Sequence, residues 1–285
     1  MCESPDCIEL CFKQAQLEVN EQIDTRLLDV EALRDRLKLR PDILLTRDDD
    51  EFLIRFLRSR KYDKDKAFEL LLNYNQFRRK HLSFFKSLKA SCLRPVFDDG
   101  LPMVSPVRDH YGRSLIFLFA GNWNTKLYTF EDILRSLLLT VEYLIESERT
   151  QLFGIVLVID FTGWKLGDMQ QCNKQHLIDA VRVFQDCFPA RFKGIHFVNQ
   201  PWYVRVMMTL IKPIIKEKLV SRMYFHGKNI MELQRYIHPD ALPRELGGDL
   251  TVPDKSWLYN ALHERELLQE KIQRKKSKRH KNFKY

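Results

Sequence analysis

Short apolar runs of strand length alternate with amphipathic helical segments from about Val96 onward, and this alternation limits the possible folds more than any other feature of the sequence. The run 154–159 is apolar throughout, which is typical of a strand buried on both faces of a parallel sheet. Further short strands are expected at 103–106, 114–120, 194–199 and 222–225. Strand–helix repetition with short connections therefore predicts an α/β domain with a mainly parallel sheet.

Helix signals fill the intervening segments and the first ninety residues. Thr129 with Asp132 resembles a capping box, which predicts a helix over 133–145. Apolar spacing predicts the other helices over 27–37, from the acidic cluster 48–51, and over 63–81, 173–187 and 202–219. We therefore expect an N-terminal segment, a helical subdomain, an α/β domain and a basic tail, at 1–24, 25–92, 93–262 and 263–285.

The positive charge is unevenly distributed. The net charge is +9, and residues 271–285 carry eight Lys or Arg and no acid, which leaves +1 for the rest. Within that body, residues 191–222 hold seven basic residues against one acid, so the remainder is −5. A local basic stretch on a near-neutral body favours an anionic surface over nucleic acid as partner. The tail is expected to be a disordered, solvated segment, with polybasic attachment to a membrane or nucleic acid as the alternative.

Motifs for enzymatic chemistry are missing from the sequence. It contains no phosphate-binding or dinucleotide-binding glycine loop, no nucleophile elbow and no zinc-type spacing among its six cysteines. His226 and His238 have no evident second ligand nearby and are interpreted as structural. We expect no enzyme activity, no metal and no cofactor. No apolar run reaches the roughly 18–20 residues of a membrane span and no signal peptide opens the chain, so a soluble, cytosolic protein is expected.

The segment 202–215 is unusually apolar, and basic residues interrupt it. Paired methionines at Met207 and Met208 suit a surface that packs against variable apolar partners. Arg205 and Lys212 would stand at the rim of such a helix, where long basic side chains meet an anionic interface. The simpler interpretation is a core helix. The alternative is a lid that touches a membrane.

Six segments together form a recognisable pattern: FLIRFLRSRKYD at 52–63, IDFTGW at 159–164, FPARFKGIHFVNQP at 188–201, IKP at 211–213, HG at 226–227 and LPRELGG at 242–248. In this order and spacing they cover about 25–260, and the chain resembles the Sec14-like (CRAL-TRIO) lipid-transfer family. The branch is that of the retinaldehyde-binding and α-tocopherol transfer proteins. The resemblance implies a helical N-terminal subdomain and an α/β bowl that encloses one hydrophobic ligand beneath a mobile gate helix, here within 202–219.

The resemblance also implies a phosphoinositide headgroup site beside the gate. Five basic residues match its positions: Arg60, Arg191, Lys193, Lys218 and Arg222. Lys218 and Arg222 would share a helix face if the helix extends that far, and Arg191 and Lys193 would share a side if extended. Guanidinium groups suit phosphate because they bind it through two donors, and lysine adds a point charge.

Matching positions and periodicity together define a candidate ligand pocket. It is made of Leu134, Leu137, Val141, Ile155, Ile159, Val183, Phe184, Phe188, Ile195, Met207 and Ile211. In the tocopherol transfer protein, serines occupy the positions of Leu137 and Val141. Because the replacement removes two hydroxyls, the pocket is expected to suit a uniformly apolar or acyl-chain ligand better than a chromanol.

Two functional hypotheses from different classes follow. The first is a lipid-binding and transfer protein of the cytoplasm, peripherally associated with endosomal or Golgi membranes that contain phosphoinositides such as phosphatidylinositol bisphosphate. The second is a phosphoinositide-reading trafficking adaptor, in which bowl occupancy is structural and trafficking proteins are the partners. Exchange of bound ligand between vesicles separates them. Nucleic acid is not expected as a partner, since the body outside 191–222 is acidic. A steep salt dependence of binding to duplex DNA would support that alternative.

Overall fold

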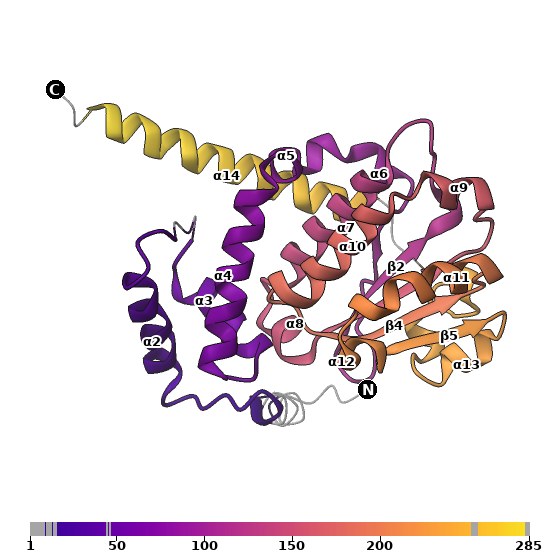
Figure 1. The fold of residues 1–285 in the computed structure, drawn as a ribbon, viewed down its shortest axis with the longest axis horizontal. Helices are drawn as coiled ribbons and strands as arrows, with labels where there is room; N and C mark the ends of the chain where they lie inside the picture. The colour runs from indigo at the N-terminus through magenta and orange to yellow at the C-terminus, as the bar shows by residue number, and fades with distance from the viewer. Residues whose placement is uncertain are drawn as a thin grey trace.

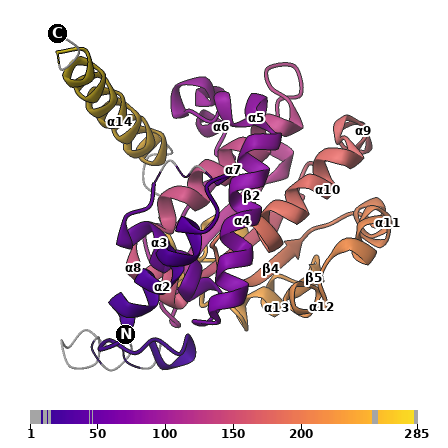
Figure 2. The same cartoon turned by 60° about the vertical axis from the view of Figure 1, so that its left-hand side comes forward.

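A computed structural model describes residues 9, 13, 16–43, 45, 47–251 and 256–282, without the side chains of residues 83 and 273–282. One five-stranded sheet forms the centre of the C-terminal part, and helices cover both of its faces (Figure 1). The N-terminal helices stand beside this domain, as Figure 2 shows from a second direction. The predicted combination of a helical N-terminal region and an α/β domain is confirmed.

The strands of the sheet follow their chain order in space. They are β1 (Met103–Val104), β2 (Ser114–Phe119), β3 (Ile155–Asp160), β4 (Phe192–Val198) and β5 (Met223–Gly227). Strand β1 pairs antiparallel with β2, and every other pair is parallel. This confirms the mainly parallel sheet and places β3 and β4 in its interior.

Local sequence signals explain where several helices begin. The helices are α2 (Arg26–Lys38), α3 (Asp50–Ser59), α4 (Lys64–Lys80), α5 (Leu82–Lys86), α6 (Arg94–Asp98), α7 (Phe130–Leu144), α8 (Glu148–Phe153), α9 (Leu166–Gln171), α10 (Lys174–Arg182), α11 (Trp202–Ile211), α12 (Glu217–Val220), α13 (Ile230–Gln234) and α14 (Ser256–Asn282). Asp49 and Asp63 cap α3 and α4 by accepting backbone N–H groups of the first turn. Thr129 and Asp132 form the predicted capping box of α7.

The helical N-terminal region and the α/β domain share one apolar core. Phe52 and Phe56 of α3 pack edge-on against Tyr74 of α4, with their ring centroids 5.8 and 5.6 Å from that of Tyr74. Tyr74 in turn contacts Phe188, which precedes β4, at 5.7 Å. The N-terminal helices are therefore packed against the sheet domain through aromatic contacts. The four domain boundaries expected from the sequence remain predictions.

Two of the predicted helices are interrupted. The segment 202–219 is not one helix, because α11 ends at Ile211 and a 3-10 turn, Lys212–Ile214, separates it from α12. Pro213 accounts for the break, since proline has no N–H to continue the helical ladder. The segment 173–187 likewise ends as an α-helix at Arg182 and continues as a π-helical turn, Val183–Cys187.

The basic tail is the largest correction to the expected organisation. Residues 263–282 continue α14 instead of forming a disordered segment, and 283–285 lie outside the described residues. Leu258, Tyr259 and Leu262 are buried where α14 packs near α6, so its first turns are anchored in the core. The helix then projects from the side opposite α11 (Figure 1). Among the described helices, none is both long and apolar enough to cross a bilayer.

Candidate functional site

The two faces of the sheet are covered to different degrees. Toward α13, the side chains from β2, β3 and β4 are completely buried in one cluster: Leu115, Phe117, Val156, Val158 and Val198. We call this the closed face. Toward α11, four apolar side chains of β3, β4 and β5 are only partly buried: Ile159, Ile195, Met223 and Phe225. We call this the open face, since these side chains keep accessible apolar surface, although Leu157 and Phe197 on the same side are buried.

A cavity of about 420 Å³ lies between α11 and the open face. Its apolar wall comes from Met208 of α11, Ile215 and Val220 after it, and Met223 and Phe225 of β5. Three polar residues of α11 and its C-terminal turn border the same volume: Arg205, Thr209 and Lys212. The size lies within the range of about 300–1,000 Å³ that is typical of small-molecule sites, and this volume is called the α11 cavity below.

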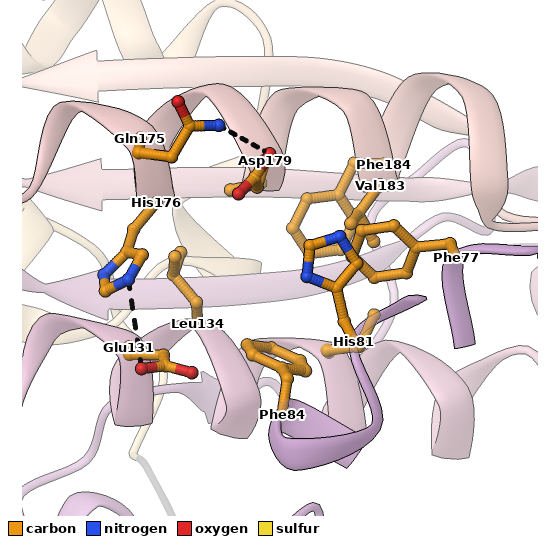
Figure 3. A pocket seen from close by; sticks show the side chains of 12 residues that line it. Phe77, His81, Phe84, Glu131, Leu134, Gln175, His176, Asp179, Val183 and Phe184 are labelled. Carbon is orange, nitrogen blue, oxygen red and sulfur yellow. Dashed lines mark hydrogen bonds and ion pairs between the residues drawn. The ribbon is translucent and has the colours of Figure 1, made fainter. Parts of the chain in front are cut away.

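A second cavity of about 350 Å³ lies among α4, α5, α7 and α10 (Figure 3). Its apolar side is lined by Phe77, Phe84, Leu134, Leu138, Ala180, Val183 and Phe184. Polar groups stand on its other side, where Gln175 donates a 3.0 Å hydrogen bond to Asp179 and His176 lies 3.9 Å from the carboxylate of Glu131. We call it the α7–α10 cavity.

The eleven residues predicted for the ligand pocket are distributed over several parts of the interior. Leu134, Val183 and Phe184 line the α7–α10 cavity. Leu137, Val141, Ile155 and Phe188 are buried in the main core. Ile159 and Ile195 contact both the main core and the cluster beneath α11. Met207 is partly buried and Ile211 is buried on α11, and neither lines the α11 cavity.

None of the eleven pocket residues predicted from the sequence lines the α11 cavity. On α11 the methionine at the cavity is Met208, one position after the predicted Met207. On β5, Met223 and Phe225 are two residues apart and therefore face the same side of the sheet. The alternation of residues along β5 was the sequence signal that could have identified Met223 and Phe225. It became interpretable only when the strand order showed β5 to be the edge beneath α11.

Helix α11 carries apolar side chains on its outer side as well. Trp202, Val206 and Leu210 are 72%, 53% and 62% exposed, and their spacing of four residues places them on one stripe of the helix. Only Val204 and Ile211 of this helix are buried. Hydrogen bonds hold its two ends: Tyr203 donates to the carbonyl of Trp164 at 2.8 Å, and Gln185 donates to the carbonyl of Ile214 at 3.0 Å. The helix is thus anchored at its ends and lightly packed between them.

The structure brings the five predicted phosphoinositide residues together. They come from four segments, and Lys61 joins them, so the group that we call the basic cluster consists of Arg60, Lys61, Arg191, Lys193, Lys218 and Arg222. Arg191 and Lys193 share a side, as expected, because both contact the carboxylate of Glu18. Lys218 and Arg222 do not share a helix face, since α12 ends at Val220.

The pKa shifts in the basic cluster show how close its charges are. Burial lowers the pKa of Lys218, and the neighbouring charges of Arg222, Lys61 and Arg60 lower it further. The pKa values of Arg191 and Lys193 are also lowered, in each case mainly by burial. Within the part of the chain that the structure describes, Lys218 has no ion-pair partner. These mutually repelling cations outnumber the carboxylates that act on them, those of Glu18, Asp186 and Glu69, so the site favours an anion.

Three cluster members also have structural contacts. Arg191 donates to the carbonyl of Leu152 at the end of α8, and Arg222 donates to the carbonyl of Phe192. Arg60 donates to the carbonyl of Gln185 at 3.1 Å. These bonds hold the guanidinium groups in place before any ligand arrives, which lowers the entropic cost of binding an anion.

A pair of buried histidines lies on the closed face. His196 Nδ1 and His226 Nε2 are 2.9 Å apart, and both side chains are almost completely buried. His226 therefore has a close histidine neighbour, contrary to the expectation of an isolated residue. Burial, and next the charges of His226 and Arg113, lower the pKa of His196 to about 3. The residues lie thirty positions apart and meet only because β4 pairs with β5.

Comparison with known proteins adds the following findings. The CRAL/TRIO domain matches residues 98–248, and the CRAL/TRIO N-terminal domain matches residues 20–73. The chain is 44% identical to clavesin-1 of Xenopus laevis over 249 residues, which cover 87% of this chain and 74% of that protein. It is 43% identical to clavesin-2 of Homo sapiens, covering 87% and 75%. The segments 120–123 and 188–203 also favour the clavesins.

Among solved structures, the chain resembles the crystal structure of Sfh5 with a TM-score of 0.43 and 16% sequence identity. That likeness covers 78% of this chain and 81% of the other, and at this TM-score it supports no conclusion about function. Among the residues described by the structure, no group of three or more His, Cys, Asp or Glu is placed to hold a metal ion.

Proposed function

Because the chain belongs to the CRAL/TRIO family of Sec14-like lipid-binding proteins, we propose that it encloses a small hydrophobic ligand against the open face and exchanges it at phosphoinositide-containing membranes. One observation carries the proposal: α11 has an apolar stripe exposed to solvent and borders a cavity along its flank. A helix with both features is suited to touch a bilayer while it covers a ligand.

The open face favours an apolar ligand. Ile159 and Ile195 join the apolar cluster beneath α11 to the main core, which reaches the α7–α10 cavity through Val183 and Phe184. Leu137 and Val141 offer no hydroxyl in that core, in keeping with an acyl-chain or similarly apolar cargo instead of a chromanol. The three pocket residues on the α7–α10 cavity, together with Ile159 and Ile195 on the sheet, support a ligand that extends between the two cavities.

Ligand exchange is proposed to take place at the membrane because release of an apolar ligand into water is unfavourable. A ligand that exposed about 300 Å² of apolar surface would cost roughly 7.5 kcal/mol to release into water. Trp202, Val206 and Leu210 would enter the interfacial region of the bilayer, and movement of α11 would open the cavity directly to lipid. The mechanism has no covalent step. The headgroup favours the open state of α11 because it binds that state more tightly than the closed one.

The basic cluster supports a phosphorylated headgroup as the membrane signal. It combines guanidinium groups held by backbone carbonyls with the exposed ammonium of Lys218. Inositol phosphates present two or more phosphate groups, which match several cations at once. We propose endosomal and Golgi membranes as the site of action, with the protein peripherally associated from the cytoplasm.

A trafficking adaptor is the second candidate, and one observation favours it. Lys61 and Lys218 are exposed without any movement of α11, so a headgroup has access to them whether or not cargo is bound. In that case the enclosed lipid would be structural, and trafficking proteins would be the functional partners. The two candidates differ in whether cargo moves between membranes.

The test is lipid transfer between donor and acceptor vesicles, with and without phosphatidylinositol bisphosphate in the acceptor. The variant Lys218→Ala/Arg222→Ala is compared with Lys228→Ala/Arg244→Ala, which removes two exposed cations outside the basic cluster. We expect the headgroup to accelerate transfer by the native protein and by the control, and to have little effect on the first variant. Headgroup binding without transfer would favour the adaptor. Equal behaviour of both variants would contradict the assigned headgroup site.

A further inference from the structure

We infer that Glu18 is an internal competitor for the basic cluster: its carboxylate occupies an anion position that a headgroup phosphate must take, and it thereby sets how tightly phosphorylated ligands bind. The inference rests on the proposed function, since it concerns the same basic cluster. It identifies a residue from the N-terminal segment as a determinant of headgroup affinity. No sequence motif pointed to it.

The contacts of Glu18 resemble those of a bound anion. Its Oε1 atom accepts a 2.7 Å hydrogen bond from Nη2 of Arg191 and a second bond from the ammonium of Lys193. These cations are largely covered, with side chains 8% and 19% exposed, so they have little access to water that would weaken the interaction. One carboxylate oxygen thus bridges two of the cations proposed for phosphate.

The neighbours of Glu18 hold the segment in this position. Val19 is completely buried and packs with Leu152, whose carbonyl accepts a hydrogen bond from Arg191. Glu21 is buried and accepts two hydrogen bonds, at 2.9 and 2.7 Å, from the guanidinium of Arg58. Because Val19 and Glu21 anchor the backbone on both sides, removing the charge of Glu18 should leave the segment in place. The position of the Glu18 carboxylate is therefore set by the packing of its neighbours and not by its own ion pairs.

Electrostatics favour Glu18 in its charged form. Burial raises its pKa, but the hydrogen bond from Lys193 and the charges of Lys193, Arg191 and Lys61 outweigh burial, so the pKa is lowered. As an intramolecular group it is present at a high effective concentration. It therefore lowers, by one common factor, the affinity of every anion that binds these two cations. Headgroups with several phosphates retain measurable binding because they also contact Lys218 and Arg222. A single phosphodiester lacks these additional contacts and is expected to bind too weakly to measure.

The experiment compares Glu18→Gln with Glu245→Gln, which removes the same charge from an exposed position in the 3-10 turn Arg244–Leu246. The full chain is titrated with soluble inositol trisphosphate and, separately, with vesicles that contain phosphatidylinositol bisphosphate. We expect Glu18→Gln to bind both probes about three- to tenfold more tightly than the native protein, and Glu245→Gln to be unchanged. A gain in affinity has the further advantage that partial misfolding cannot produce it.

Several results would overturn the inference. Equal affinities for the native protein and Glu18→Gln, while Lys218→Ala still weakens binding, would exclude competition and leave the proposed headgroup site intact. An effect confined to vesicles would mean that Glu18 acts by general repulsion from the membrane. Equal gains in Glu18→Gln and Glu245→Gln would assign the effect to net charge. If neither probe binds and Lys218→Ala changes nothing, the headgroup site fails together with the inference.

Discussion

The closed and open faces share strands β3 and β4, yet the part of the open face beneath α11 is packed less completely than the closed face. On the closed face, Phe117, Val156 and Val158 are at most 1% exposed. On the open face, Ile159 alternates with the buried Val158 along β3 but keeps accessible surface, and Met223 and Phe225 border a cavity of about 420 Å³. Since alternating residues of one strand serve both faces, the difference comes from what covers the sheet. Leu233 of α13 and the segment 237–246 after it cover the closed face, and α11 covers part of the other face only lightly.

This difference separates stability from binding within one sheet. Fully packed apolar side chains contribute most to the free energy of unfolding, and unfilled apolar volume lowers it. A face that leaves such volume beneath α11 therefore contributes less to stability. It retains a surface on which a ligand can be buried. In the proposed function the closed face is the scaffold, and the open face is the binding surface.

The largest expected difference is between matched phenylalanine truncations on the two faces. Phe117→Ala should lower the free energy of unfolding by about 3–5 kcal/mol, because Phe117 is fully enclosed on the closed face. Phe225→Ala should cost only about 1–2 kcal/mol, because Phe225 already borders a cavity. Urea denaturation of both variants measures the difference. Similar losses would mean that the open face is as important to stability as the closed one.

The histidine pair predicts that acid destabilises the protein through the closed face. His196 has its pKa lowered to about 3 in the folded state, so between its unfolded pKa and 3 the unfolded chain binds the extra proton. Stability is therefore lost as the pH falls, by about 2 kcal/mol from this residue between pH 7 and pH 5. Denaturation at a series of pH values should show a shallower slope for His196→Gln. The exposed His238→Gln is the control, and an unchanged slope in His196→Gln would contradict the assignment.

The outer stripe of α11 should affect membrane binding without affecting stability. Trp202→Ser/Leu210→Ser removes two exposed apolar side chains, so the free energy of unfolding should change by less than about 0.5 kcal/mol. Binding to vesicles should weaken about tenfold or more, since this apolar area no longer enters the interface. Co-sedimentation with vesicles measures it. Leu127→Ser/Met231→Ser, at exposed positions outside α11, should behave like the native protein; an equal loss in both would argue against α11 as the contact.

Features encoded by neighbouring residues could be predicted from the sequence. The capping box of Thr129 and Asp132 and the apolar run of β3 involve residues close together in the chain, and both predictions are confirmed. The family motifs also identified five cations that lie together in the structure. The continuation of α14 into the basic tail was not expected, because the composition of the tail suggested disorder.

Features created by long-range pairing could not be predicted in the same way. His196 meets His226 only through the register of β4 and β5, and Met208 faces the α11 cavity because of how the helix is rotated over β5. Glu18 reaches Arg191 across more than 170 residues of sequence. Such contacts depend on tertiary placement, for which the local pattern carries no signal.

The central claim is that the open face holds a lipid, and native mass spectrometry of the purified protein after exposure to lipid vesicles tests it most directly. The decisive variant is Met208→Trp, which places a larger side chain in the α11 cavity. Its matched control is Met231→Trp, at an exposed position of α13 on the closed side of the sheet. We predict one bound lipid per chain in the native protein and the control, and a substantial loss in Met208→Trp. A chain that binds no lipid, or a Met208→Trp variant that retains it fully, would contradict the account.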